Sequence, residues 1–238
     1  MADYLVFQLY GPMAAWGDIA VGEYRPSFAH PSKSAIIGLL AAALGIRRDE
    51  EERQRSLAEA CSFAVRVDAM GYLLRDYHTA QVPSAKKGIT HYTRRSELAV
   101  ENLNTILSSR DYRCDAAYTV AIHVSDRSSV SVQMISEKLH SPEFILYLGR
   151  KSCPSALPLQ PKIVEANNFK EVFMKVSFST EVLSGITTSP QVSVYWEGGV
   201  ESGYESDHIV TRRDEPLSRK RRQFSERHEN YASIRKEG

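Results

Sequence analysis

The order of its apolar segments constrains the fold of this chain more than any other feature. Runs of aliphatic, aromatic and β-branched side chains predict strands, and they lie at residues 4–10, 62–68, 116–124 and 144–148. Helical spacing and cap signals predict helices, at residues 31–44, 49–60 and 132–140. A strand–helix–strand order is thus repeated after a long interruption. This order is typical of an α+β, ferredoxin-like domain, in which a four-stranded antiparallel sheet carries helices on one face.

The interruption, residues 72–113, holds few apolar positions and has no strong period, and it is long for a loop inside a compact domain. Between Arg75 and Arg95 the only acid is Asp76. The cations there are five, which gives a local net charge of 5 − 1 = +4, and they are Arg75, Lys86, Lys87, Arg94 and Arg95. Tyr77, His78, His91 and Tyr92 are interleaved with them. We expect a protruding, cationic arm.

After residue 155 the pattern changes to strand-like pieces at 172–178, 191–196 and 208–211. Residues 211–238 then hold nine Lys or Arg and five Asp or Glu, with few large apolar side chains. We therefore predict a ferredoxin-like domain over 1–155, with the arm inserted, and a small β-rich region over 156–238 that ends in a basic, loosely held tail; the order of residues 217–238 stays open.

Composition narrows the class of protein. The net charge is only +1, so any surface for nucleic acid must come from local segregation of charge. Three scattered cysteines favour a reducing compartment over a disulfide framework or a zinc site. The longest apolar run, residues 35–46, is too short to cross a bilayer, and the first residues lack the basic start of a signal peptide. We expect a cytoplasmic protein.

Motifs for common enzyme chemistry are missing from the sequence. There is no P-loop, no HExxH, no GxSxG and no paired acidic motif that would hold two metal ions. This points away from a metal-dependent enzyme, and we expect neither a metal nor a cofactor.

Several polar residues stand just before and at the start of the 31–44 helix, namely Arg25, His30, Lys33 and Ser34. Ser32 is expected to cap this helix, and Gly45 to end it. Free N–H groups at a helix start, with cations beside them, form a candidate phosphate site. Because a cation at this end opposes the helix dipole, Lys33 is unfavourable unless an anion offsets it, which favours a ligand over a solvated charge.

Two further segments could contact a nucleic acid. Trp16, in the glycine-containing loop 11–17, could stack on a base, although a core tryptophan is the favoured alternative. Gly149, Arg150 and Lys151 could grip a backbone phosphate, or form an ordinary basic turn. The cations at 212–213 and 219–222 could also bind phosphates, but a solvated tail is the default for them.

His78 is a candidate acid or base, since histidine changes protonation near neutral pH and a neighbouring Tyr or Lys could assist attack of a 2′-hydroxyl on phosphate. Phosphate contact or stacking without chemistry is the alternative. Taken together, cations at loops and on an arm, interleaved with aromatic rings, are what a surface for single-stranded RNA requires.

Six motifs carry a family resemblance that runs in order over nearly the whole chain. They are GPMAAWG at 11–17, RPSFAHPSKSAIIGLLAAALGI at 25–46, LRDYHT at 74–79, CDAAYTVAI at 114–122, YLGRKSCP at 147–154 and RRDEP at 212–216. Together they resemble the CasD subunits of type I-E CRISPR Cascade complexes, which belong to the RAMP superfamily.

This resemblance implies a ferredoxin-like domain with a thumb-like arm that clamps the 5′ handle of the CRISPR RNA (crRNA). It implies as neighbours a repeated backbone subunit and the large subunit that reads the PAM, with target DNA bound through the complex. By hypothesis, phosphate contacts from the palm would come from Arg25, Lys33, Ser34, Arg150 and Lys151, and His30 and Arg75 are further candidate RNA contacts. Thumb contacts would come from Lys86, Lys87, Arg94 and Arg95, with Tyr77, His78 and Trp16 against bases.

Two other functions remain open at this point. In type I-C systems a relative of this family is the metal-independent endoribonuclease that processes the guide RNA. That task would fall here to His78 or His91, with Tyr77, Lys86 or Lys87. The protein could also serve mainly as an assembly scaffold.

Overall fold

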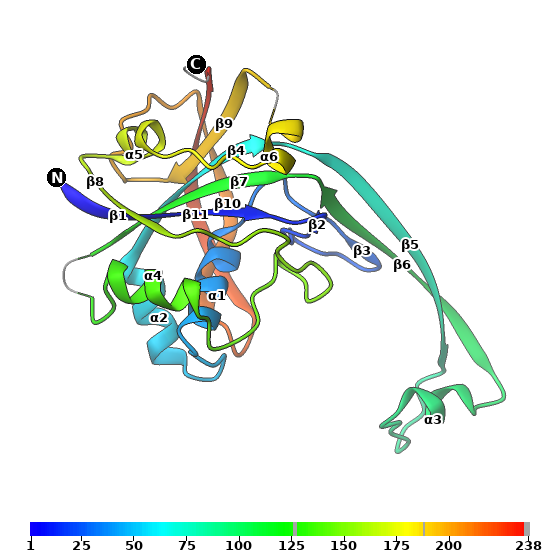
Figure 1. Ribbon diagram of the computed structural model, residues 1–238. Coiled ribbons are helices and arrows are strands. Elements are labelled where there is room, and N and C mark those ends of the chain that lie inside the picture. Colours follow the sequence, from blue (N-terminus) through cyan, green and yellow to red (C-terminus); the bar gives the residue numbers. More distant parts are fainter. Residues whose placement is uncertain (126–127, 188, 236–238) are drawn as a thin grey trace.

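A seven-stranded antiparallel sheet forms the centre of the computed structural model, which describes residues 1–125, 128–187 and 189–235 (Figure 1). In spatial order the strands are β10 (His208–Ser218), β11 (Gln223–Arg235), β9 (Gln191–Glu197), β4 (Cys61–Ala69), β7 (Ala117–Val124), β1 (Ala2–Tyr10) and β8 (Lys162–Ala166). The fold is therefore mixed α+β, as predicted.

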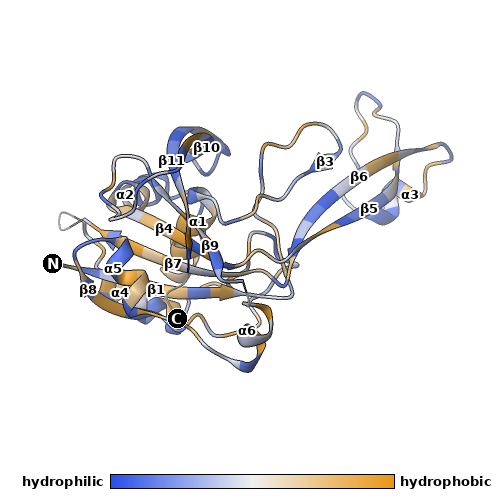
Figure 2. Ribbon diagram, turned by 90° about the horizontal axis from the view of Figure 1, so that it is seen from above, coloured by the Kyte–Doolittle hydropathy of each residue, from blue (hydrophilic) through white to orange (hydrophobic). Residues whose placement is uncertain are grey.

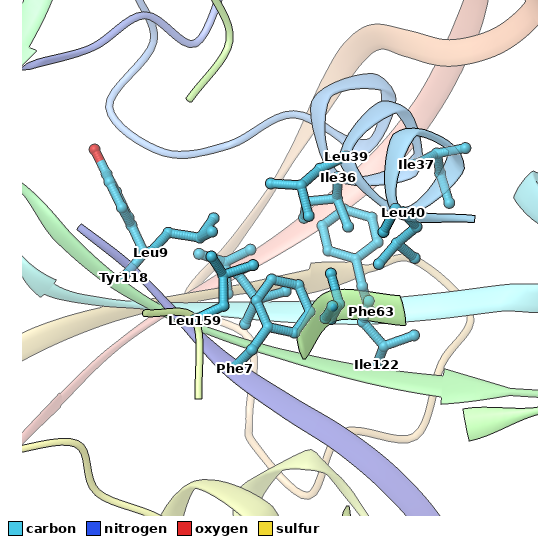
Figure 3. Packing of buried hydrophobic residues seen from close by; sticks show 14 of the residues in the cluster. Phe7, Leu9, Ile36, Ile37, Leu39, Leu40, Phe63, Tyr118, Ile122 and Leu159 are labelled. Carbon is cyan, nitrogen blue, oxygen red and sulfur yellow. The ribbon is translucent and has the colours of Figure 1, made fainter. Parts of the chain in front are cut away.

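Both faces of this sheet are covered. On one face the helices are α1 (Lys33–Ala43), α2 (Glu51–Ala60) and α4 (Val132–His140). Alternate residues of β1, among them Phe7, turn to this side and meet Leu40 and Phe63 in the main core (Figure 3). On the other face, α5 (Phe169–Lys175) and α6 (Glu181–Ile186) pack against Tyr4 and Tyr10.

The arm, residues 72–114, projects far from the sheet (Figures 1 and 2). Its strands β5 (Tyr72–Pro83) and β6 (Leu103–Cys114) pair antiparallel along their whole length. The short helix α3 (Arg94–Leu98) lies at its outer end. At its root, the two-residue strands β2 (Met13–Ala14) and β3 (Tyr24–Arg25) pair with β6.

Most predicted elements are present, but two predicted strands are not. Residues 144–148 are irregular, with one bridge from Tyr147 to Pro154, because β8 occupies the edge beside β1. Residues 172–178 lie mostly in α5 rather than in a strand. Asn168 caps that helix, and Phe169, Val172 and Phe173, at helical spacing, are buried.

The predicted loose tail is also wrong for its described residues. Residues 217–235 form the end of β10, a turn and β11, and β11 is an inner strand between β10 and β9. Its Ala232 is buried in the core beneath α5. Residues 236–238 of the predicted tail lie outside the described part. Strands β1, β4 and β7, which precede residue 155, and strands β8 to β11, which follow it, belong to one sheet.

Among the described residues, no helix combines the length and the apolar character that crossing a bilayer would require.

Candidate nucleic-acid interface

The two faces of the arm carry different predicted residues. Because successive side chains of a strand point to opposite faces, Arg75 and Tyr77 share one face of the arm and Asp76 and His78 share the other. Tyr77 is 62% exposed. His78 is also exposed, and its Nε2 lies 2.7 Å from a carboxylate oxygen of Asp76. The side chains of Tyr77 and His78 therefore cannot both reach the same phosphate or base, because they lie on opposite faces of the two-stranded arm.

Exposed cations gather at the outer end of the arm. Lys86, Lys87 and Arg95 are exposed. Arg94 donates to the carboxylate of Glu97 at 2.7 Å and to the carbonyl of Gln81, so it supports the turn of the chain there. This end of the arm thus offers predicted cations to solvent without burying them in the fold.

The root of the arm holds a cluster built on the buried carboxylate of Asp111. Arg75 donates to it from Nε at 2.8 Å, and the hydroxyl of Tyr24 donates to its other oxygen. The Arg75 guanidinium also lies 4.9 Å from the centre of the Tyr24 ring. The hydrogen bond from Arg75 is the main reason why the pKa of Asp111 lies below its usual value, although burial opposes this.

The turn at 148–151 reaches the same root. Gly149 has φ +87°, and a Cβ there would meet the carbonyl oxygen of Ala15 at 1.9 Å, so this close approach requires glycine. Arg150 then lies 4.8 Å over the ring of Tyr112 and donates to the carbonyl of Arg25 at 3.3 Å. Lys151 is exposed. The structure thus brings Arg25, Arg75, Arg150 and Lys151 from three separate segments toward the root of the arm.

Lys33 does not form the predicted phosphate site. Its Nζ lies 2.7 Å from a carboxylate oxygen of Glu197 and 2.8 Å from one of Glu215, and its backbone N–H donates to Asp214 at 2.8 Å. Burial would lower the pKa of Lys33, but the two carboxylates raise it. The anion that the sequence argument required is present, and it comes from the C-terminal strands of the same chain.

His30 is fully buried and belongs to the same polar region. Its Nε2 lies 3.2 Å from one carboxylate oxygen of Glu229, and Arg212 lies 3.1 Å from the same oxygen. Arg227 lies 2.6 Å from the other oxygen of Glu229. The ring stacks on Tyr195, with 3.7 Å between ring centres. His30 is therefore a structural residue, and RNA cannot reach it in this conformation.

Trp16 is a core residue and not an exposed stacking platform. Its side chain is 1% exposed and meets the ring of Tyr118 edge-on, with 5.5 Å between ring centres. Its backbone N–H donates to the hydroxyl of Ser27 at 3.0 Å. The short loop after β1 turns the ring inward, so the core alternative holds.

A second cationic region, which sequence reasoning largely missed, lies at the start of α1. A cleft of about 1270 Å³ opens between α1, residues 15–20, residues 145–149 and the β10–β11 hairpin. Of the predicted site residues only Ser34 lines it. The charged lining residues are Asp18, Arg48, Arg212, Arg213, Asp214, Arg219 and Arg222. The run of cations at 219–222 was the available signal, but it was interpreted as part of a solvated tail.

No group of three or more His, Cys, Asp or Glu side chains suited to a metal ion gathers within the described residues. The exposed groups of the site are instead guanidinium, ammonium, phenol and imidazole groups, which bind phosphates and stack on bases.

An α+β fold with a projecting cationic arm defines this chain as a candidate nucleic-acid-binding protein. Comparison with known proteins identifies its family. Residues 4–229 match the family described as CRISPR-associated protein (Cas_Cas5). The chain belongs to this family.

The CRISPR system Cascade subunit CasD of Escherichia coli (strain K12) is 31% identical over 237 residues, which cover 95% of this chain and 94% of the relative. A solved CRISPR RNA-guided surveillance complex contains a chain with a TM-score of 0.68 and 24% identity, covering 98% of this chain and 90% of that one. A second solved structure, of a Cas protein, has a TM-score of 0.64 and 23% identity, covering 98% and 95%. The resemblance to CasD is confirmed.

Proposed function

We propose that this protein is the subunit of a type I-E Cascade complex that caps the 5′ handle of the crRNA and helps to assemble the complex for antiviral DNA targeting. The observation that carries the proposal is the likeness to CasD, which extends over 95% of the chain and so includes the arm as well as the sheet. The exposed cations at the outer end and the root of the arm support it.

The fold supports a RAMP assignment. Strands β4, β7, β1 and β8 lie side by side in the order and directions of a ferredoxin-like sheet, with α1 and α4 on one face. In this interpretation the arm is the thumb, inserted between the second and third strands of the domain. The C-terminal β-rich region, 156–238, continues the same sheet.

The contacts that we propose differ from the sequence-based set. Palm contacts to phosphates would come from Arg25, Arg75, Arg150 and Lys151 at the root of the arm. Thumb contacts would come from Lys86, Lys87, Arg94 and Arg95. Tyr77 and His78 would meet bases on opposite faces of the arm. Recognition by such groups reads the shape and the backbone of the RNA, and it requires no cofactor.

Apolar side chains on the arm support a role in assembly. Tyr92 is 91% exposed, and Ile89 and Leu98, which also belong to the arm, are 57% and 46% exposed. An isolated two-stranded hairpin is marginally stable in water, so an arm that exposes such side chains is suited to packing against a neighbour. We propose the repeated backbone subunit as that neighbour, with the large PAM-reading subunit at the body and the complex in the cytoplasm.

The decisive experiment measures binding of fluorescently labelled 5′-handle RNA to the purified protein over a series of salt concentrations. The Lys86→Gln/Lys87→Gln double variant is expected to bind more weakly, and its salt slope is expected to fall by about one unit for each cation lost. The matched control is Arg53→Gln/Arg55→Gln on α2, which lies away from the arm (Figure 1). An unchanged affinity and slope in the arm variant would refute the thumb assignment.

A further inference from the structure

Arg219, in the four-residue turn between β10 and β11, lies over a helix rather than in solvent. Its Nη1 donates to the backbone carbonyl of Ser34 at 2.6 Å. The guanidinium also crosses α1 at Gly38, where a Cβ would come within 2.3 Å of Nη2. Glycine at this helical position, which costs helix stability, leaves room for the guanidinium on the wall of the cleft.

The charge of Arg219 is not neutralised by the chain. Lys33, Arg66, Arg212 and Arg227, which are also shielded from solvent, each bind at least one carboxylate. No described carboxylate comes within ion-pairing distance of Arg219. The charged group that acts on it is another cation, Arg48. Burial, together with repulsion from Arg48, lowers the pKa of Arg219. Such an arrangement is costly unless an anion enters the cleft.

The rest of the lining also favours an anion. The lining holds five arginines and two acids, and because Arg212 is already bound to Glu229 at 3.1 Å, the arginines left for a ligand are Arg48, Arg213, Arg219 and Arg222. One of the two acids, Asp214, is already bound by Arg227 at 2.6 Å. Tyr147 and Phe224 add aromatic rings to the lining.

We propose that this cleft binds the phosphodiester backbone of single-stranded RNA, with Arg219 as its central phosphate ligand and Arg48 and Arg222 at the rim. The proposal rests on the proposed function, because the RNA is the crRNA handle, but it assigns a second contact region apart from the arm. RNA is favoured over an acidic peptide because the lining combines guanidinium groups, which match phosphate geometry, with rings on which bases can stack. A cleft of about 1270 Å³ also has room for more than one nucleotide.

Two variants test the cleft with the same labelled handle RNA. Gly38→Ala adds a methyl group where Arg219 lies, and it displaces the guanidinium without changing the net charge. This variant should fold, since alanine favours the helix and the group that must move is the end of a flexible side chain. Arg48→Gln/Arg222→Gln removes two rim charges. Its matched control is Lys220→Gln/Arg221→Gln, which removes two exposed charges of the same turn that do not line the cleft.

We expect Gly38→Ala and Arg48→Gln/Arg222→Gln to bind the RNA about tenfold more weakly, as loss of charge-assisted hydrogen bonds requires. The control should stay within about twofold. Thermal unfolding checks that each variant is folded. Ultraviolet crosslinking of the RNA should label peptides that contain Tyr147 or Phe224.

The outcomes separate this inference from the proposed function. If the cleft variants bind like their control while Lys86→Gln/Lys87→Gln loses affinity, the cleft inference is wrong and the proposed function stands. If the wild-type protein does not bind the RNA, both are wrong. If poly-L-glutamate binds in a manner that Gly38→Ala abolishes, while RNA binding is unaffected by that change, the cleft serves an acidic protein segment and the RNA proposal is overturned.

Discussion

Asp111 and Arg75 occupy paired positions on the two strands of the arm, and the guanidinium donates two hydrogen bonds to the buried carboxylate, at 2.8 and 3.2 Å. The contact lies where the arm leaves the sheet. Asp111 is 2% exposed, whereas Arg75 is 55% exposed, so the pair joins the core to the solvent-facing part of the arm.

We expect Asp111→Asn to destabilise the protein by about 1–2 kcal/mol, because it removes a charge-assisted pair of which one partner is half exposed. The root of the arm should loosen as well, so limited proteolysis should cut within residues 76–110 faster. Urea unfolding and a proteolysis time course measure the two effects. Glu97→Gln, which breaks the exposed pair with Arg94, is the control and should change stability by less than about 0.5 kcal/mol.

Lys33 provides a test between a phosphate ligand and a structural cation. Lys33→Met leaves the carboxylates of Glu197 and Glu215 without their shared cation, and we expect a loss of about 3–5 kcal/mol in the free energy of unfolding. The salt slope of RNA binding should not change. Lys86→Met should behave in the opposite way, with stability unchanged and a lower slope. A reduced slope in folded Lys33→Met would show that Lys33 contacts RNA after all.

The buried side chains of His30 and Glu229 predict that the stability of the fold decreases in two steps as the pH is lowered. Burial is the main reason why the pKa of His30 is lowered, so the folded state holds the ring neutral while the unfolded chain binds a proton below about pH 6.5. Stability should therefore fall as the pH decreases from about 6.5. A further loss should begin near the ordinary glutamate pKa. Burial alone would raise the pKa of Glu229, but the hydrogen bond from His30 and the charges of Arg212 and Arg227 lower it to about 2.

Urea unfolding between pH 8 and pH 4 measures this profile, with His30→Gln as the comparison variant. The variant should lose the step that begins near pH 6.5, since it lacks the titrating ring, and should keep the more acidic one. Identical profiles for the two proteins would contradict the assignment of the first step to His30.

The endoribonuclease alternative has a direct test. Tyr77 and His78 lie on opposite faces of the arm, and Lys86 and Lys87 follow beyond the end of β5, so the proposed catalytic set does not gather around one point. We expect no cleavage of repeat RNA by the pure protein in EDTA. If cleavage occurs and His78→Ala abolishes it while still binding the RNA, the protein is a processing enzyme and the non-enzymatic function is wrong.

The local elements of this fold could be predicted because the forces that set them act over a few residues. Ser32 and Ser131 cap α1 and α4 with their own hydroxyls, and the apolar spacing that follows each cap determines the buried face. The arm was also predictable as a protrusion, because residues 72–113 hold too few apolar side chains to form part of a core. Its two long strands were not, since their pairing joins positions far apart in sequence.

The sequence by itself determined strands β1, β4 and β7, helices α1, α2 and α4, the position of the cationic arm and, through its motifs, the family. Only the tertiary structure decided which cations are free. Lys33 is neutralised by Glu197 and Glu215, and Arg219 meets α1 at Gly38, across separations of more than 160 residues. Whether a charge is paired or buried depends on which distant segments fold against it, and local sequence patterns hold no record of that.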